Sequence, residues 1–172
     1  MKLFNYVVLF IYITQLNLYA QISSQSMQAS VNMIKPLAIT AIGGEIDFSE
    51  IILTGTPRNI VLSPQNGKIF KVEGHPNRNI IITFSSQPLT NSQWVSNFGG
   101  TIGTINFSPS VVHTGANSSY SNPISITSGS SITLPNSQGI GNLYIWVGGS
   151  ISIAANQPHG DYIGTFNLTV SY

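Results

Sequence analysis

Short runs of β-branched and aromatic residues recur along this chain and are separated by Gly, Pro, Asn and Ser. Helical runs, with apolar residues at three-four spacing, are absent. In the clearest run, Phe166, Leu168 and Val170 alternate with polar residues almost to the last residue. Many short strands between turns are typical of a sandwich. The pattern predicts an all-β, immunoglobulin-like antiparallel sandwich of about seven to ten strands, formed by residues 21–172 as a single domain.

The strongest strands are predicted over residues 79–84, over 143–153 with a bend at Gly148 and Gly149, and over 162–172. Residues 59–63 and 68–72 flank an Asn-Gly pair, which predicts a hairpin with positive φ angles in its turn. The predicted core consists of large apolar side chains, namely Phe48, Ile60, Leu62, Phe70, Ile81, Tyr162, Phe166, Leu168 and Val170.

The first twenty residues have the features of a signal peptide. Lys2 provides a positive start, residues 6–13 are apolar, and Ala20 precedes a predicted cleavage before Gln21. The alternative is a membrane anchor, but the apolar run is shorter than the roughly 20 residues that a spanning helix needs. We therefore predict an exported protein of the periplasm, the cell surface or the extracellular space, with no integral membrane segment in its mature chain.

The composition argues against several classes of partner. Only 6% of the residues are charged, and without Lys2 five cations balance five acids. Such a chain lacks the basic surface typical of nucleic-acid binding or of binding to anionic membranes. With 42% hydrophobic residues it is expected to fold. It contains no cysteine, which excludes disulfides, thiolate metal sites and cysteine nucleophiles.

No residue pattern indicates catalysis. His159 and Asp161 lie close together in a Pro-His-Gly-Asp stretch, but such residues are also typical of a turn, and no Gly-x-Ser-x-Gly motif marks a nucleophilic serine. His75 and His113 are isolated, outside any zinc-binding pattern. We predict that the chain is not an enzyme, with no catalytic, cofactor-binding or metal residues and no cofactor.

Three of the five acids fall within six positions: Glu45, Asp47 and Glu50. Glu45 and Asp47 would share one face of a strand, a spacing that can contribute to a Ca²⁺ site. The alternative is a solvated edge that discourages aggregation. A glycosidase pair would need a second carboxylate across a cleft, which only Glu73 or Asp161 could provide. The sequence does not decide whether the three acids bind a cation.

Aromatic residues suggest a second kind of surface. Trp94, Tyr144 and Trp146 could form a platform for sugar rings, since amphipathic rings are common at binding surfaces. Trp146 lies in a strong strand with bulky residues on both faces, so a core or subunit-contact role competes with this interpretation.

The N-terminal segment, residues 27–34, alternates apolar Met27, Ala29, Val31 and Met33 with polar residues. Such alternation predicts a strand with one apolar face. The strand can belong to the chain's own sandwich. It can also complete a neighbouring subunit, with backbone hydrogen bonds giving affinity and alternate side chains filling pockets.

Several blocks together resemble a bacterial exported family, the domain of unknown function 4402. They cover most of residues 21–172 in order, with a weak stretch over 85–130. One departure is Ser49, where the family commonly has Gly after the Phe. The blocks are residues 31–40, 46–48, 72–84, 143–153 and 158–172.

The resemblance implies a pilin-like or spore-coat-like β-sandwich and provides no catalytic residues to transfer. We therefore expect an exported structural or pilin-like subunit of the cell surface, which would assemble by β-strand addition. The alternative is a monomeric adhesin or carbohydrate-binding module. The expected partners are copies of the same chain or related surface subunits, together with a periplasmic chaperone. The ligand and polymerisation itself are not determined by the sequence.

Fractionation of the native host tests the predicted export. We expect the mature chain, beginning near Gln21, in the periplasm or outside the cell, and we expect reducing agent to leave its stability unchanged. N-terminal sequencing of each fraction measures the first outcome. Uncut protein in the cytoplasm would refute both the compartment and a role at the surface.

Overall fold

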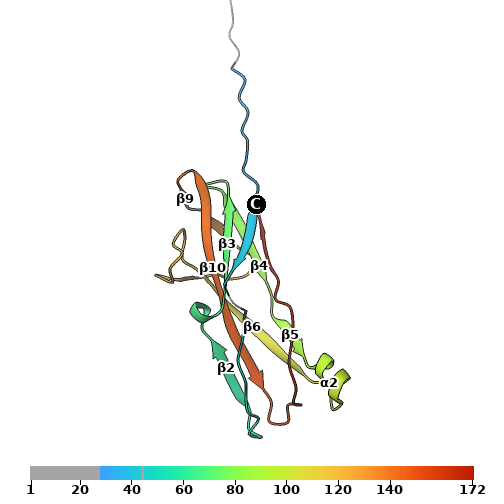
Figure 1. Cartoon of the computed structure of the whole chain (residues 1–172). Helices are drawn as coiled ribbons and strands as arrows, with labels where there is room; N and C mark the ends of the chain where they lie inside the picture. Colours follow the sequence, from blue (N-terminus) through green and yellow to red (C-terminus); the bar gives the residue numbers. More distant parts are fainter. Residues whose placement is uncertain (1–27, 44) are drawn as a thin grey trace, which may run out of the picture. The chain divides into compact units, whose positions relative to one another are not determined.

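The computed structural model describes residues 28–43 and 45–172 (Figure 1). The chain divides into two units, residues 1–33 and residues 34–172. All of the described strands lie in the second unit, which is the sandwich discussed below.

The described residues form eleven strands in two antiparallel sheets, one short α-helix, α2 (Ser92–Phe98), and one 3-10 helix, η2 (Pro64–Asn66). The prediction of an all-β, immunoglobulin-like antiparallel sandwich is confirmed. The strand number exceeds the predicted range because two of the strands have only two residues each. The large sheet contains β1 (Ala38–Ile42), β2 (Arg58–Leu62), β3 (Lys68–Gly74), β5 (Gln87–Thr90), β6 (Thr104–His113), β7 (Ile124–Ser125), β9 (Asn136–Ser137) and β10 (Ile140–Ile153), and the small sheet contains β11 (Leu168–Ser171), β4 (Asn79–Phe84) and β8 (Ser130–Thr133).

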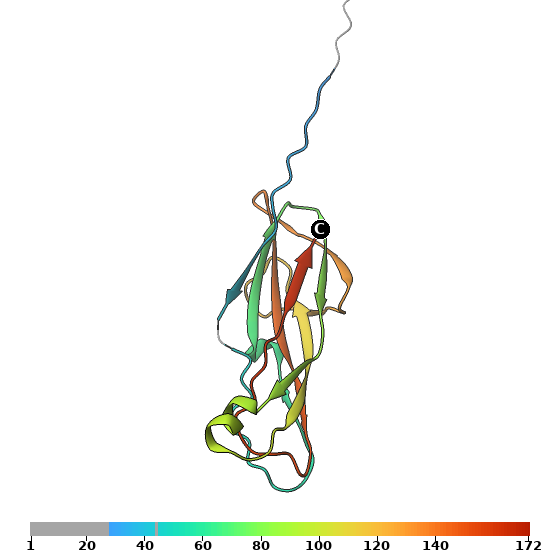
Figure 2. The same ribbon diagram turned by 90° about the vertical axis from the view of Figure 1, so that its right-hand side faces the viewer.

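Strand β10 is the centre of the large sheet (Figures 1 and 2). It has 14 residues, pairs with β6 along one edge, and pairs with both β3 and β2 along the other. Its register with β6 continues unbroken through Gly148 and Gly149, so the predicted bend is wrong there. The glycines provide space instead: a Cβ at Gly148 would lie 2.3 Å from the Leu62 carbonyl oxygen.

The predicted hairpin of residues 59–63 and 68–72 is also wrong. Strands β2 and β3 pair with successive parts of β10 rather than with each other, and η2 connects them. The Ser63 side chain accepts a hydrogen bond from the Gln65 backbone N–H, and Pro64 begins the helical turn. Gly67 has a φ of −98°, so the Asn-Gly pair does not form the tight turn that its sequence suggested.

The sandwich has two clusters of buried side chains. The first lies between the two sheets and contains nine residues: Val72, Ile80, Ile82, Val111, Ile126, Leu134, Leu143, Ile145 and Val147. The second consists of Ile105 and Phe107 of β6 with Ile151 and Ile153 of β10. No residue of the small sheet's described strands packs against this second cluster.

Most of the predicted core residues surround these clusters as half-buried side chains. Leu62 is half-buried as well. The prediction that Ile81 lies in the core is wrong: its side chain is 41% exposed, whereas Ile80 and Ile82 are fully buried. Ile80, Ile82 and Phe84 share one face of β4, whereas Ile81 shares the other with polar Asn79 and Thr83, so the alternation around the Ile run indicates the inner face. Phe84, two positions after Ile82, packs against the first cluster and marks the inner face.

The predicted terminal strand is shorter than expected. Only β11 pairs with β4, while Ile163 forms an isolated bridge with Thr90 of the large sheet. Residues 164–167 connect the two sheets and belong to no strand. A similar change of sheet occurs between β4 and β5, where the chain passes directly from the small sheet to the large sheet.

Substitution of neighbouring isoleucines in β4 tests this assignment of faces. Ile82→Ala should lower the free energy of unfolding by about 2–5 kcal/mol, because it removes buried methylene groups and leaves a cavity. Ile81→Ala, the matched control, should cost less than about 1 kcal/mol because its side chain contacts solvent. Urea unfolding of the two variants measures the difference, and equal losses would contradict the observed register.

Candidate functional site

A large groove opens over the part of the large sheet that carries the second cluster. Its volume is about 1120 Å³. One wall is residues 45–53, the other is residues 157–166, and the floor is Ile105, Phe107, Ile151 and Ile153. The groove is therefore built from two long connecting segments over the far ends of β6 and β10.

The floor is apolar because β6 and β10 alternate inward and outward residues. Its four side chains are at most 6% exposed. Phe48 and Phe166 reach in from opposite walls, and each makes an edge-to-face contact with Phe107, at ring-centroid distances of 6.0 and 5.8 Å. Both phenylalanines remain only half-buried, so the apolar surface that the groove exposes belongs to its walls, while the floor beneath them is nearly fully covered.

The backbone of both walls is poorly paired. Residues 45–53 and 164–167 belong to no strand. Outside the strand ladders, no backbone–backbone hydrogen bond involves either stretch in the part of the chain that the structure describes. In the first wall, the Ser49 N–H donates to Asp47 Oδ1 at 2.8 Å. Backbone N–H and C=O groups without a backbone partner are the groups that an added strand would pair with.

Four of the five acids line the groove: Glu45, Asp47, Glu50 and Asp161. Lys68 is the cation among them, and its Nζ donates to the Gly43 carbonyl oxygen at 2.7 Å. Within residues 28–43 and 45–172, no group of three His, Cys, Asp or Glu side chains is arranged to hold a metal ion. The three neighbouring acids therefore form part of a charged rim.

The fifth acid, Glu73, lies outside the groove. Its carboxylate contacts Lys71 Nζ at 2.9 Å. This hydrogen bond lowers the pKa of Glu73 and raises the pKa of Lys71. Because Val72 between them is fully buried, the pair occupies the outer face of β3.

The predicted turn around His159 is held by a residue that sequence reasoning missed. Asn91 is fully buried; its Nδ2 donates to the carbonyl oxygens of His159 and Thr101, at 2.9 and 3.2 Å, and its Oδ1 accepts from the Gly103 N–H at 2.7 Å. The His159 ring packs edge-on against Trp94 at a centroid distance of 4.9 Å. Asn91 connects three loops that are distant in sequence, and no local motif indicates this.

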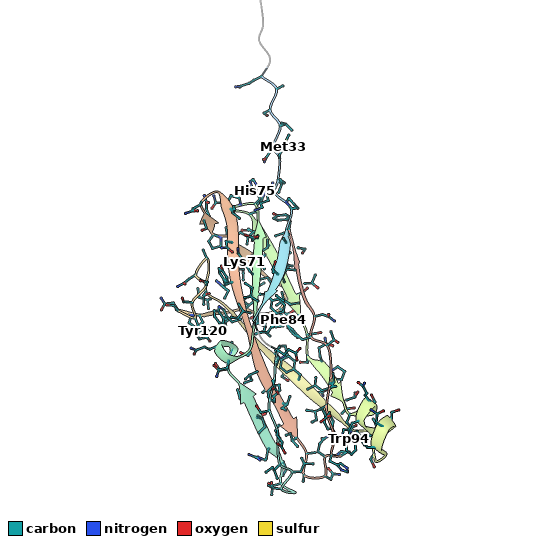
Figure 3. All side chains as sticks on the ribbon, viewed as in Figure 1. Met33, Lys71, His75, Phe84, Trp94 and Tyr120 are labelled. Atoms are coloured by element: carbon teal, nitrogen blue, oxygen red, sulfur yellow. The ribbon has the colours of Figure 1, made fainter. Side chains whose placement is uncertain are left out.

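The three predicted aromatic residues divide into two groups. Tyr144 and Trp146 share the outer face of β10, because Leu143, Ile145 and Val147 point into the core. Trp146 is only 6% exposed: it packs edge-on against Tyr120, and its Nε1 donates to Thr114 Oγ1 at 3.0 Å. Trp94 lies on α2 (Figure 3), and its ring packs against that of His159 instead. The structure thus brings two of the three residues together.

Within the N-terminal segment, Met27 lies outside the described residues. Residues 28–33 form no strand, and every one of them is exposed. Val31 and Met33 are each 81% exposed, so two of its four alternating apolar side chains contact solvent in this structure.

His113 at the end of β6 is a half-buried titratable group of the sandwich. Burial lowers its pKa below the ordinary value of 6.5. Its Nδ1 accepts a hydrogen bond from the Gly115 N–H at 3.3 Å, which requires an unprotonated nitrogen.

This environment predicts a pH-dependent stability. Below pH 6.5 the unfolded chain binds a proton at His113 more readily than the folded chain does, so the free energy of unfolding should fall as pH decreases through that value. Above it, the contribution of His113 is fully present. His113→Asn keeps a hydrogen-bond acceptor without a titrating group and should flatten this part of the profile. Urea unfolding on both sides of that pH measures it, and an unchanged slope in the variant would contradict the assignment.

A family model for a domain of unknown function, DUF4402, matches residues 38–172. The match covers every described strand of the sandwich and both walls of the groove. Comparisons with curated proteins and with solved structures found no match. Among the described residues, no helix has the length and apolar character needed to cross a membrane.

Proposed function

Since this chain belongs to the DUF4402 family, a domain of unknown function, we propose its function from its own features: it is an exported structural subunit of the cell surface. It performs no catalysis and assembles with other copies, or with related subunits, by β-strand addition. A periplasmic chaperone would protect the subunit before assembly.

The observation that carries the proposal is the N-terminal segment. It has the alternation of a strand, yet its described residues form none, and Val31 and Met33 are largely exposed. Exposing two large apolar side chains of one strand face is unfavourable in water, at roughly 25 cal/mol for each Å² of apolar surface. An acceptor that pairs with its backbone and buries this face would remove that cost.

The groove supports the proposal from the other side. Over the second cluster, residues 45–53 and 157–166 take the place of strands of the small sheet, and an added strand could pair with these segments in the groove between them. In strand addition, backbone hydrogen bonds give affinity and pockets for alternate side chains give specificity. This mode of binding suits a structural subunit that assembles with copies of itself.

A monomeric adhesin is the alternative, and one observation favours it. Trp94 and Phe98 of α2 lie with ring centroids 5.3 Å apart, and Phe98 is 72% exposed. Exposed aromatic rings of this kind can stack on sugars. The pair is small, and the ring that packs beside it on Trp94 is the imidazole of His159, which makes it the weaker basis.

Substitutions on the two faces of the N-terminal segment test the assembly. The chain beginning at Gln21 should form ladders that resist mild denaturant in electrophoresis. Replacing Val31 and Met33 with Asn should abolish the ladders, because polar amides cannot fill apolar pockets. The matched control replaces Ser30 with Asn and Asn32 with Gln, on the polar face; it adds no charge and should retain them.

Two results would contradict strand addition. One is a monomeric full-length chain at high concentration in analytical ultracentrifugation. The other is an equal loss of ladders in the apolar-face and polar-face variants. If the chain is monomeric and binds glycans through Trp94 and Phe98, the adhesin function replaces the structural one.

A further inference from the structure

We infer that the groove is the acceptor site and that residues 27–34 of a second copy occupy it as the missing strand between residues 45–53 and 164–167. This inference rests on the proposed function and adds the place of binding and the identity of the occupant. Nothing in the family match assigns a role to the groove.

The apolar surfaces of the groove and of the N-terminal segment match. The floor presents Ile and Phe side chains from β6 and β10, and the half-buried Phe48 and Phe166 stand at its sides. The donor offers Met27, Ala29, Val31 and Met33 on one face. Met is unbranched and adapts to irregular gaps, as the space between two phenylalanine rings would require.

The backbone of the groove walls can pair with an added strand. A strand needs hydrogen-bonding partners on both of its edges to be buried, since unpaired N–H and C=O groups are costly. Residues 45–53 of the first wall and residues 164–167 at the end of the second make no backbone–backbone hydrogen bond among the described residues, whereas Ile163 of the second wall pairs with Thr90. Residues 27–34 in extended form would span about 26 Å at about 3.3 Å per residue, and the first wall is itself nine residues long.

The charge of the rim favours an uncharged occupant. The rim carries Glu45, Asp47, Glu50 and Asp161 with Lys68 as the cation. Residues 21–34 contain no charged residue, and the next residue is Lys35. An uncharged strand followed by a cation meets no repulsion from this rim, whereas an acidic peptide would be rejected.

The size of the groove also favours a peptide. The volume of about 1120 Å³ exceeds the range of roughly 300–1,000 Å³ typical of small-molecule pockets. The groove has no cluster of convergent polar groups at its floor, where all four residues are apolar. An extended peptide fits both properties better than a compact ligand does.

Disulfide trapping between two different chains tests the inference, and the natural absence of cysteine makes every engineered thiol unique. One chain carries Val31→Cys, and a second chain, lengthened by a tag, carries Thr165→Cys in the groove wall. Mixing the chains under mild oxidation should give a crosslinked heterodimer of intermediate size. Ser152→Cys is the matched control, because Ser152 lies between the two floor residues of β10 but points to the opposite, exposed face. It should give no heterodimer.

A third acceptor, Thr40→Cys, examines the competing site. Strand β1 is exposed along its whole length and pairs on one edge with β3, so it could accept a strand too. The chains could form normal ladders while the cysteine of Val31→Cys crosslinks to that of Thr40→Cys and not to that of Thr165→Cys. This result would overturn the groove as the acceptor site and leave the proposed function intact.

A single chain that carries both Val31→Cys and Thr165→Cys tests whether the N-terminal segment pairs with its own groove instead of that of a second copy. If this chain closes an internal disulfide as a monomer and the two-chain mixture gives no heterodimer, the segment is the chain's own strand. That result would refute the groove as an intermolecular site and strand addition together. A heterodimer with Thr165→Cys, absent with Ser152→Cys, supports the inference.

Discussion

The structure depends on a mismatch in strand length between the two sheets. Strand β10 has 14 residues, whereas β4 of the small sheet has six and β11 and β8 have four each. The small sheet therefore buries only the first cluster, and the residues of β6 and β10 beyond it must find other cover. Apolar surface of this kind stabilises a fold only when it is removed from water. The groove is the direct consequence of a long sheet facing a short one.

The same mismatch explains why the walls are irregular. The chain leaves β1 and returns at β2 through residues 45–53, which contribute Ile46, Phe48 and Ile51 to the core but no strand. The C-terminal segment bridges to β5 at Ile163 and reaches β4 only at Leu168. Both segments supply side chains without supplying a ladder, so hydrophobic burial and backbone pairing are satisfied to different degrees. In the proposed assembly, a strand from another copy would complete the backbone pairing without displacing the buried side chains.

The sequence predicted what depends on local pattern and missed what depends on distant contacts. Alternation located β4 and β10, because their apolar runs are long and bounded by turn residues. Ile81 was predicted in the core for its hydrophobicity, although alternation over residues 79–84 places it with Asn79 and Thr83 on the outer face. The pairing of β2 and β3 with one common strand could not be predicted from an Asn-Gly pair, because it is decided by β10, which lies far along the chain. For the same reason, nothing in the sequence indicated that Asp161, far along the chain, joins the neighbouring Glu45, Asp47 and Glu50 in one rim.

The position of these acids connects the fold to assembly. Open strand edges are a risk for aggregation, and proteins commonly place charges beside them to prevent indiscriminate pairing. In a chain with so few charged residues, four of the five acids stand around the groove. Their carboxylates would weaken the binding of acidic segments and leave the groove open to an uncharged strand. In the proposed assembly, one set of charges would oppose wrong strands and tolerate the right one, so the rim would also select the partner.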